Sequence, residues 1–185
     1  DVKASAIYLD NACVSLRPNV VIDAISSYYR EHPSCHKRSV HSYGRLTTDR
    51  FQAAREVVQK AVGARRSDEI IFTRNATEAI NLVASSFGGI TTDAEHNSNT
   101  VPWMRLRKTK GILYRKLPVR PDGVFPLQEL EALLQAERVK LVSVFSTSHF
   151  LGVTNPLAQI SKLAHKHGAL FMVDGAQSLL HEQID

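Results

Sequence analysis

The sequence is poor in sulfur and in aromatic side chains, with two cysteines, two methionines and one tryptophan in 185 residues. Cys13 and Cys35 form no C-x-x-C pair, which excludes the usual zinc and disulfide patterns, and we expect no metal site. Two thiols without a secretory signal favour a reducing compartment, so we expect a cytoplasmic protein. No apolar run approaches the roughly 18 residues of a membrane span, and we expect no membrane partner.

Charge of one sign is in modest excess, with 23 basic and 18 acidic residues, a net charge of +5 and a pI of about 9.4. The basic residues occur in small groups, Arg65-Arg66 and the segment 105–110. The second group suits either a solvated helix end or a phosphate-binding patch. Because no aromatics or nucleic-acid motif accompany it, we favour solvated surface and expect no nucleic-acid partner.

Short apolar runs alternate with segments of helical period. The runs predict strands at 6–9, 69–73, 112–117, 139–145 and 169–173, and the periodic segments predict helices at 20–28, 47–62, 76–87, 127–134 and 157–167. Strands that are apolar on both sides and separated by helices predict an α/β fold. The sheet should be mainly parallel and covered by helices on both faces. The length suits one domain.

Three predicted strand ends carry polar side chains, and ligands of such sheets gather there. After 69–73, Asn75 and Thr77 open a helix that could bind a phosphate or could simply be capped by them. His149 follows the strand at 139–145, where a structural histidine is the commoner case. Asp174 ends an apolar strand, and is either a helix cap or a carboxylate with a cationic partner.

Together these segments make the chain resemble fold-type-I pyridoxal-phosphate enzymes of the class V aminotransferase group, which includes cysteine desulfurases and selenocysteine lyases. The resemblance covers nearly the whole chain. The stretches that carry it are Phe72-Thr73-Arg74-Asn75-Ala76-Thr77-Glu78-Ala79-Ile80-Asn81-Leu82, Glu95-His96-Asn97-Ser98-Asn99, Leu151-Gly152-Val153-Thr154-Asn155-Pro156 and Val173-Asp174-Gly175-Ala176-Gln177.

The resemblance implies a role for each matched position. Ala76 and Thr77 would hold the phosphate of pyridoxal 5'-phosphate. His96 would stack on its ring and take part in proton transfer. Asp174 would pair with the protonated ring nitrogen, so that the ring stays an electron sink, and Gln177 would hydrogen-bond its phenolic oxygen.

Three positions depart from the family pattern. His149 stands where the family usually has Asn, and it would donate a hydrogen bond to the cofactor with a different geometry. Only residues 89–94 separate the helix at 76–87 from Glu95, where the family places a further core strand. We therefore expect a central strand to be missing, through residues absent from this sequence. Cys13 replaces a small residue, and we expect it to be buried.

The resemblance also implies what lies beyond Asp185. The lysine that binds the cofactor covalently follows the Asp-Gly-Ala-Gln turn in the family, as do the loop with the persulfide-forming cysteine and the small C-terminal domain. We therefore expect residues 1–185 to be the N-terminal segment and the first part of the large domain, inactive alone.

For the complete protein the resemblance implies cysteine desulfurase chemistry, from L-cysteine to alanine and an enzyme persulfide. It also implies a homodimer and a sulfur-acceptor protein. Two alternatives stay open. One is another class V reaction, such as that of a C–S lyase, epimerase or aminotransferase. The other is an inactive homologue that serves as a binding scaffold.

Overall fold

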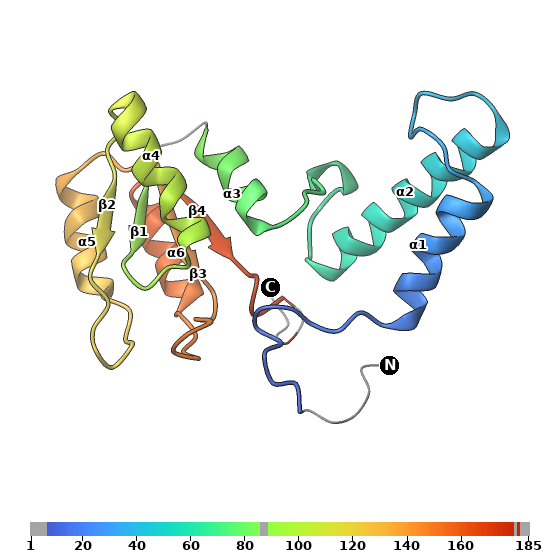
Figure 1. The fold of residues 1–185 in the computed structure, drawn as a ribbon. Coiled ribbons are helices and arrows are strands. Elements are labelled where there is room, and N and C mark those ends of the chain that lie inside the picture. The colour runs from blue at the N-terminus through green and yellow to red at the C-terminus, as the bar shows by residue number, and fades with distance from the viewer. Residues whose placement is uncertain (1–6, 86–88, 180, 182–185) are drawn as a thin grey trace. The chain divides into compact units, whose positions relative to one another are not determined.

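The computed structural model describes residues 7–85, 89–179 and 181. The chain divides into two compact units, and the division falls between Ile71 and Phe72. No helix in the described residues is long and apolar enough to cross a membrane. Figure 1 labels the elements along the chain.

The first unit contains two long helices, α1 (Asn19–Glu31) and α2 (Ser42–Ala61), and the short 3₁₀ helix η1 (Ser67–Glu69). The helix predicted at 47–62 is confirmed but begins earlier, because His41 caps it: its Nδ1 accepts a hydrogen bond from the Gly44 N–H at 3.3 Å.

Two strands predicted for this part of the chain are wrong. Residues 7–9 of the first are irregular, and its remaining residue lies outside the described ranges. Residues 70–73 of the second follow η1 without joining a sheet, and Ile71 and Phe72 stay 68% and 44% exposed. A strand forms only where a neighbour completes its backbone hydrogen bonds, and the described residues offer none there. Cys13 is exposed, so the prediction of a buried thiol is also wrong.

The second unit is built on a four-stranded parallel sheet. Its strands are β1 (Ile90–Thr92), β2 (Arg115–Leu117), β3 (Leu141–Phe145) and β4 (Leu170–Asp174), in the spatial order β2-β1-β3-β4. β3 and β4 pair along their whole length, from Leu141 opposite Leu170 to Phe145 opposite Asp174. The α/β architecture with a parallel sheet is confirmed.

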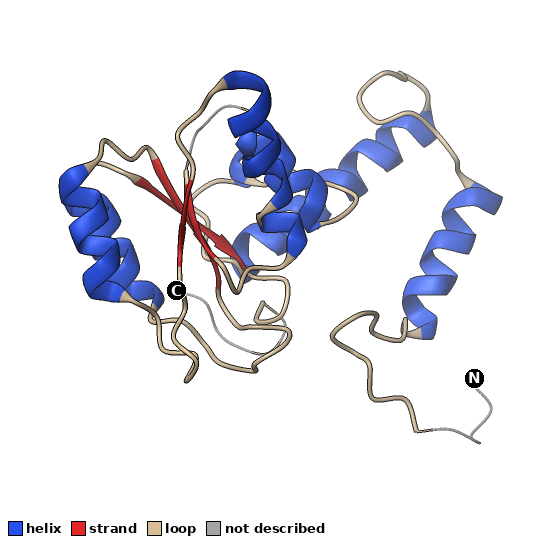
Figure 2. Cartoon of the chain, turned by 60° about the vertical axis from the view of Figure 1, so that its left-hand side comes forward, coloured by secondary structure: helices blue, strands red, loops and turns tan. Residues whose placement is uncertain are grey.

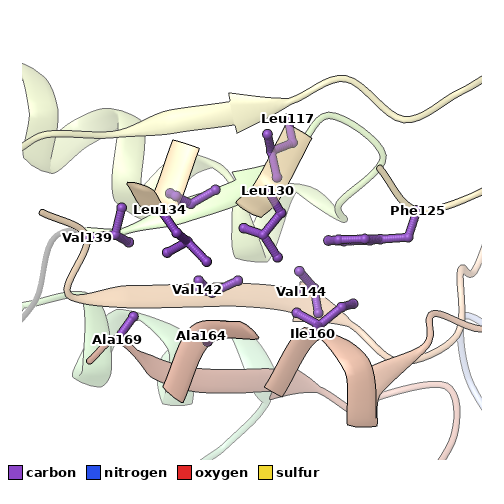
Figure 3. Close-up of a cluster of buried hydrophobic side chains, with 11 residues drawn as sticks. Leu117, Phe125, Leu130, Leu134, Val139, Val142, Val144, Ile160, Ala164 and Ala169 are labelled. Carbon is purple, nitrogen blue, oxygen red and sulfur yellow. The ribbon is translucent and has the colours of Figure 1, made fainter. Parts of the chain in front are cut away.

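Helices of this unit lie on both sides of the strands (Figure 2). On one face α5 (Leu127–Ala136) and α6 (Leu157–Lys166) bury a cluster of aliphatic side chains that includes Leu130, Val142 and Ile160 (Figure 3). On the other face, α3 (Ala76–Ala84) and α4 (Val101–Lys110) pack around Trp103, which is fully buried. Because side chains alternate along a strand, β3 sends Val142 to the first cluster and Leu141 to the second.

The expected gap in the centre of the sheet is absent. Residues 90–92 themselves form β1, which lies between β2 and β3 and is buried at all three positions. Thr91 and Thr92 give this strand polar side chains, so it lacks the apolar run by which the other strands are recognised. α4 follows it, and the basic group 105–110 occupies the exposed C-terminal turns of α4, where cations complement the helix dipole.

The aliphatic cluster yields the first prediction. Replacing Leu130, which has no exposed surface, by alanine should lower the unfolding free energy by about 2–5 kcal/mol, because it removes buried methyl groups and leaves a cavity. Urea denaturation measures the change. Gln128→Ala, an exposed position on the same helix, is the control and should leave stability within about 0.5 kcal/mol of the parent. Equal stabilities of the two variants would contradict the assignment of this core.

Candidate functional site

The carboxyl ends of β1, β3 and β4 meet at one edge of the sheet. β1 leads into Glu95 and His96, β3 leads into the loop with His149, and β4 ends at Asp174. The last backbone link of the sheet joins two of these ends, since the Ser146 N–H donates to the Asp174 carbonyl at 2.8 Å. This is the edge at which parallel α/β sheets bind ligands.

Asp174 lies at the end of β4 with its carboxyl partly exposed at the sheet edge. Its Oδ1 accepts a hydrogen bond from the Ala176 N–H at 3.1 Å, which fixes the side chain over the turn that follows. That turn is closed by bonds from the N–H groups of Ser178 and Leu179 to the Gly175 carbonyl, at 3.1 and 3.0 Å. Gln177 lies within it, half-buried. Asp174 therefore ends a strand, and its side chain accepts from the tight turn that follows it.

The structure brings His96 and His149 together. Their ring centroids are 5.0 Å apart and the rings meet edge to face, although 53 positions separate them in the sequence. His96 is held in its turn by Ser98, whose N–H and Oγ lie 3.2 and 2.8 Å from His96 Nδ1. Both imidazole side chains are exposed and available to a ligand at the sheet edge.

The loop that carries His149 is fixed from below by buried polar groups. Asn155, 5% exposed, donates from Nδ2 to the Phe145 carbonyl at 2.9 Å and from its backbone N–H to the Ser146 carbonyl at 2.8 Å. Ser148 Oγ accepts from the Leu151 N–H at 3.0 Å, and Gly152 takes a left-handed backbone angle of φ 67°. Hydrogen bonds from the motif Leu151–Pro156 thus hold the loop in which His149 is exposed.

Ala76 and Thr77 form the first turn of α3, where a helix supplies no acceptors for its own N–H groups. Asn75 caps the helix, since its Oδ1 accepts from the Glu78 N–H at 2.9 Å. The interpretation of Asn75 as a helix cap is therefore confirmed. Thr77 stays exposed beside the helix N-terminus. α3 packs against the 3₁₀ turn η2 (Asn97–Asn99) that follows His96, and its first turn lies toward the carboxyl edge of the sheet (Figure 1).

Glu95 is the feature of this edge to which the sequence analysis assigned no role. It is 8% exposed, and its carboxyl oxygens accept hydrogen bonds from Thr92 Oγ1 and Asn99 Nδ2, both at 2.8 Å. Burial raises the pKa of Glu95 to about 7; the hydrogen bonds oppose this shift and the charge of Asp174 adds to it. A signal in the sequence could have pointed to Glu95. It is spaced by four residues from Asn99, as Asn99 is from Trp103, and residues at this spacing share one side of a helical turn.

Comparison with known proteins places this arrangement in a family. The model of the Aminotransferase class-V family matches residues 7–185. The chain belongs to the class V aminotransferases. A probable cysteine desulfurase of Halalkalibacterium halodurans is 40% identical over 97% of the chain, and a cysteine desulfurase of Salmonella gallinarum is 37% identical over 96%. The chain spans 46% of the length of each, so it corresponds to about half of these relatives.

Solved structures agree with this assignment. The apo cysteine desulfurase of Thermococcus onnurineus NA1 superposes with a TM-score of 0.84 at 32% identity, over 96% of this chain and 46% of its own. The cysteine desulfurase CsdA of Escherichia coli superposes with a TM-score of 0.79 at 29% identity, over 96% and 47%. The fold predicted from the sequence, the large domain of fold-type-I enzymes, is confirmed for the half that the chain covers.

Class V aminotransferases depend on pyridoxal 5'-phosphate, and the side chains at this edge have the chemistry to receive it. Asp174 is an anion suited to a protonated pyridine nitrogen. The N-terminus of α3 suits a dianionic phosphate. The planar imidazole ring of His96 suits stacking on the planar pyridine ring of the cofactor. Among the described residues no group of three or more His, Cys, Asp or Glu side chains is placed to hold a metal ion.

The buried acid yields the second prediction. Glu95 is protonated in both states below pH 4.5, ionised only in the unfolded chain between pH 4.5 and about 7, and ionised in both states above. Its contribution to stability is therefore full at low pH and lost as pH rises through 7. One pKa unit corresponds to about 1.4 kcal/mol, so stability relative to Glu95→Gln should fall by about 3 kcal/mol over this window.

Urea denaturation at several pH values between about 5 and 8 measures this difference. Glu129→Gln, which changes an exposed carboxyl on α5, is the matched control and should keep the pH dependence of the parent. A Glu95→Gln variant whose stability follows the parent at every pH would show that Glu95 is ionised throughout.

Proposed function

We propose that this chain is the N-terminal segment and first part of the large domain of a pyridoxal-phosphate-dependent cysteine desulfurase. The complete protein would convert L-cysteine to alanine and leave the sulfur as a persulfide on a cysteine of the enzyme. One observation carries the proposal. The family resemblance assigns His96 to the face of the cofactor ring and Asp174 to the ring nitrogen, and both lie where strands of one sheet end at the same edge.

The phosphate and the ring nitrogen would be bound by different residues. The backbone N–H groups of Ala76 and Thr77 and the Thr77 hydroxyl would bind the phosphate at the start of α3, where the helix dipole favours an anion. Asp174 would bind the protonated ring nitrogen and keep that proton in place. The Ala176 N–H already holds Asp174 Oδ1, so the carboxylate needs little reorganisation to bind a ligand.

The ring itself would be held by the two histidines and Gln177. His96 would cover one face of the ring and take part in proton transfer. His149, in edge contact with His96, and Gln177, in the turn after Asp174, would donate hydrogen bonds to the cofactor oxygen. When bound, the cofactor supplies the electron sink that weakens the C–S bond of the substrate.

Further parts of the enzyme belong to the complete protein. By the family resemblance, the covalently bound lysine, the cysteine loop and the small domain would follow this segment. Lys162 and Lys166 lie on α6, before Asp174, and do not match the position of that lysine. By the same likeness we propose a cytoplasmic homodimer that passes sulfur to an acceptor protein. The chain's identity of 37–40% to cysteine desulfurases supports this choice over another class V reaction.

A second candidate function is a binding scaffold without catalysis. The observation in its favour is His149, which stands at the position where the family usually has Asn. The short region before Glu95 does not favour it, because this region forms the central strand β1. Cofactor binding and sulfur release by the complete protein decide between the two: a protein that cannot be loaded with pyridoxal 5'-phosphate would be the scaffold.

The third prediction concerns Asp174. In the complete protein, Asp174→Ala should weaken pyridoxal 5'-phosphate binding by about tenfold or more, because it removes a charge-assisted hydrogen bond to the ring nitrogen. Alanine formation from L-cysteine should be lost with it. Equilibrium dialysis and visible absorbance measure binding, and product analysis measures turnover.

The matched control is Asp23→Ala, which removes an exposed carboxylate from α1 in the other unit and should bind and turn over as the parent does. An Asp174→Ala protein with the parent's affinity and turnover would refute the cofactor site proposed here.

A further inference from the structure

Behind the candidate site lies a chain of buried hydrogen bonds centred on Asn99, which has no exposed surface. Its Oδ1 accepts from Ser143 Oγ at 2.7 Å and from Trp103 Nε1 at 3.1 Å. Two donors on Oδ1 fix the orientation of the amide, so Nδ2 must find an acceptor on the other side. Glu95 Oε2 is that acceptor, at 2.8 Å.

The chain of hydrogen bonds joins four elements at the sheet edge. Thr92 ends β1, Glu95 and Asn99 belong to the turn that follows, Trp103 lies on α4 and Ser143 lies on β3. All five side chains are buried. Leaving a buried polar group unpaired costs free energy. Each of these hydrogen bonds therefore opposes rearrangement of the other hydrogen bonds.

His96 lies inside the segment that this chain of hydrogen bonds fixes. Its carbonyl accepts from the Asn99 N–H at 2.8 Å, so the backbone turn that starts at His96 closes on Asn99, whose side chain Glu95 also binds. Glu95 points into the core while the neighbouring His96 stays exposed and meets His149. The buried carboxyl is therefore the anchor of a turn whose exposed side carries the imidazole.

We propose that Glu95 is a positioning residue of the cofactor site, which holds His96 in place through Thr92 and Asn99 without itself contacting the cofactor. This rests on the proposed function, and extends it to a residue behind the site. Glutamine can replace the acid, since its oxygen accepts from Asn99 while its amide donates to the Thr92 hydroxyl. Alanine leaves both partners unpaired.

The test is a double-mutant cycle in the complete protein, with pyridoxal 5'-phosphate affinity as the readout. Glu95→Ala and His96→Ala should each weaken binding by about tenfold or more. If Glu95 acts through His96, the double variant should bind about as the His96→Ala variant does. Glu95→Gln should retain binding within about twofold, whereas an exposed change on α5, Glu129→Ala, should have no effect.

Two measurements report on the position of the turn more directly. The circular dichroism of the bound cofactor reflects how its ring is held, and should fall in Glu95→Ala and recover in Glu95→Gln. In cofactor-free protein, the indole N–H resonance of Trp103 should shift in Glu95→Ala, because Asn99 relays the change. Should Glu95→Ala fail to fold, Thr92→Val removes one hydrogen bond to Glu95 at nearly constant volume and enters the same cycle with His96→Ala.

Additive losses in the cycle, or binding by Glu95→Ala equal to that of the parent, would overturn the role of Glu95 alone. A parent protein that binds no pyridoxal 5'-phosphate would overturn the proposed function, and this role with it. Coupled losses with rescue by glutamine would establish that Glu95 acts through the turn.

Discussion

Parallel pairing of β1, β3 and β4 is the constraint on which the candidate site depends. Strands that run in one direction bring their carboxyl ends to one edge, so residues 95–96, 149 and 174 become neighbours although long segments separate them. The pairing continues to the last residue of β4, opposite Phe145, and one further backbone bond joins Ser146 to Asp174. A slip in this register would separate the imidazoles from the carboxylate.

The edge is built in two layers of different chemistry. Below lie buried polar groups, such as Asn99 and Asn155, each satisfied by hydrogen bonds to backbone or side chains. Above lie the exposed imidazoles of His96 and His149. Buried polar groups stabilise little on balance, but they allow only one arrangement, because each alternative leaves a donor or an acceptor unpaired. A ligand site needs this single arrangement of the buried groups, because they hold its exposed side chains in place.

Strands and helices with a strong local hydrophobic pattern could be predicted from the sequence. β3 and β4 are apolar runs, α5 and α6 have a helical period, and each formed within a few residues of its predicted position. β1 could not be found in this way, because its threonines are buried by hydrogen bonding rather than by hydrophobicity. The run at 69–73 was misleading for the opposite reason: it has the composition of a strand, but no strand pairs with it among the residues that the structure describes. Glu95 was missed because a carboxyl is usually exposed, and its four-residue spacing from Asn99 and Trp103 becomes meaningful only once its donors are placed.

The two layers also explain why a shared fold does not determine which reaction a protein catalyses. Superposition compares backbones, and the backbone at this edge is held by the buried groups Asn155, Ser148 and Glu95 rather than by the exposed imidazoles. A change at an exposed tip, such as histidine for asparagine at position 149, alters the donor offered to a ligand without disturbing those bonds. Members of the class can therefore keep one scaffold and differ in chemistry. Function then depends on the exposed side chains of the site rather than on the fold that carries them.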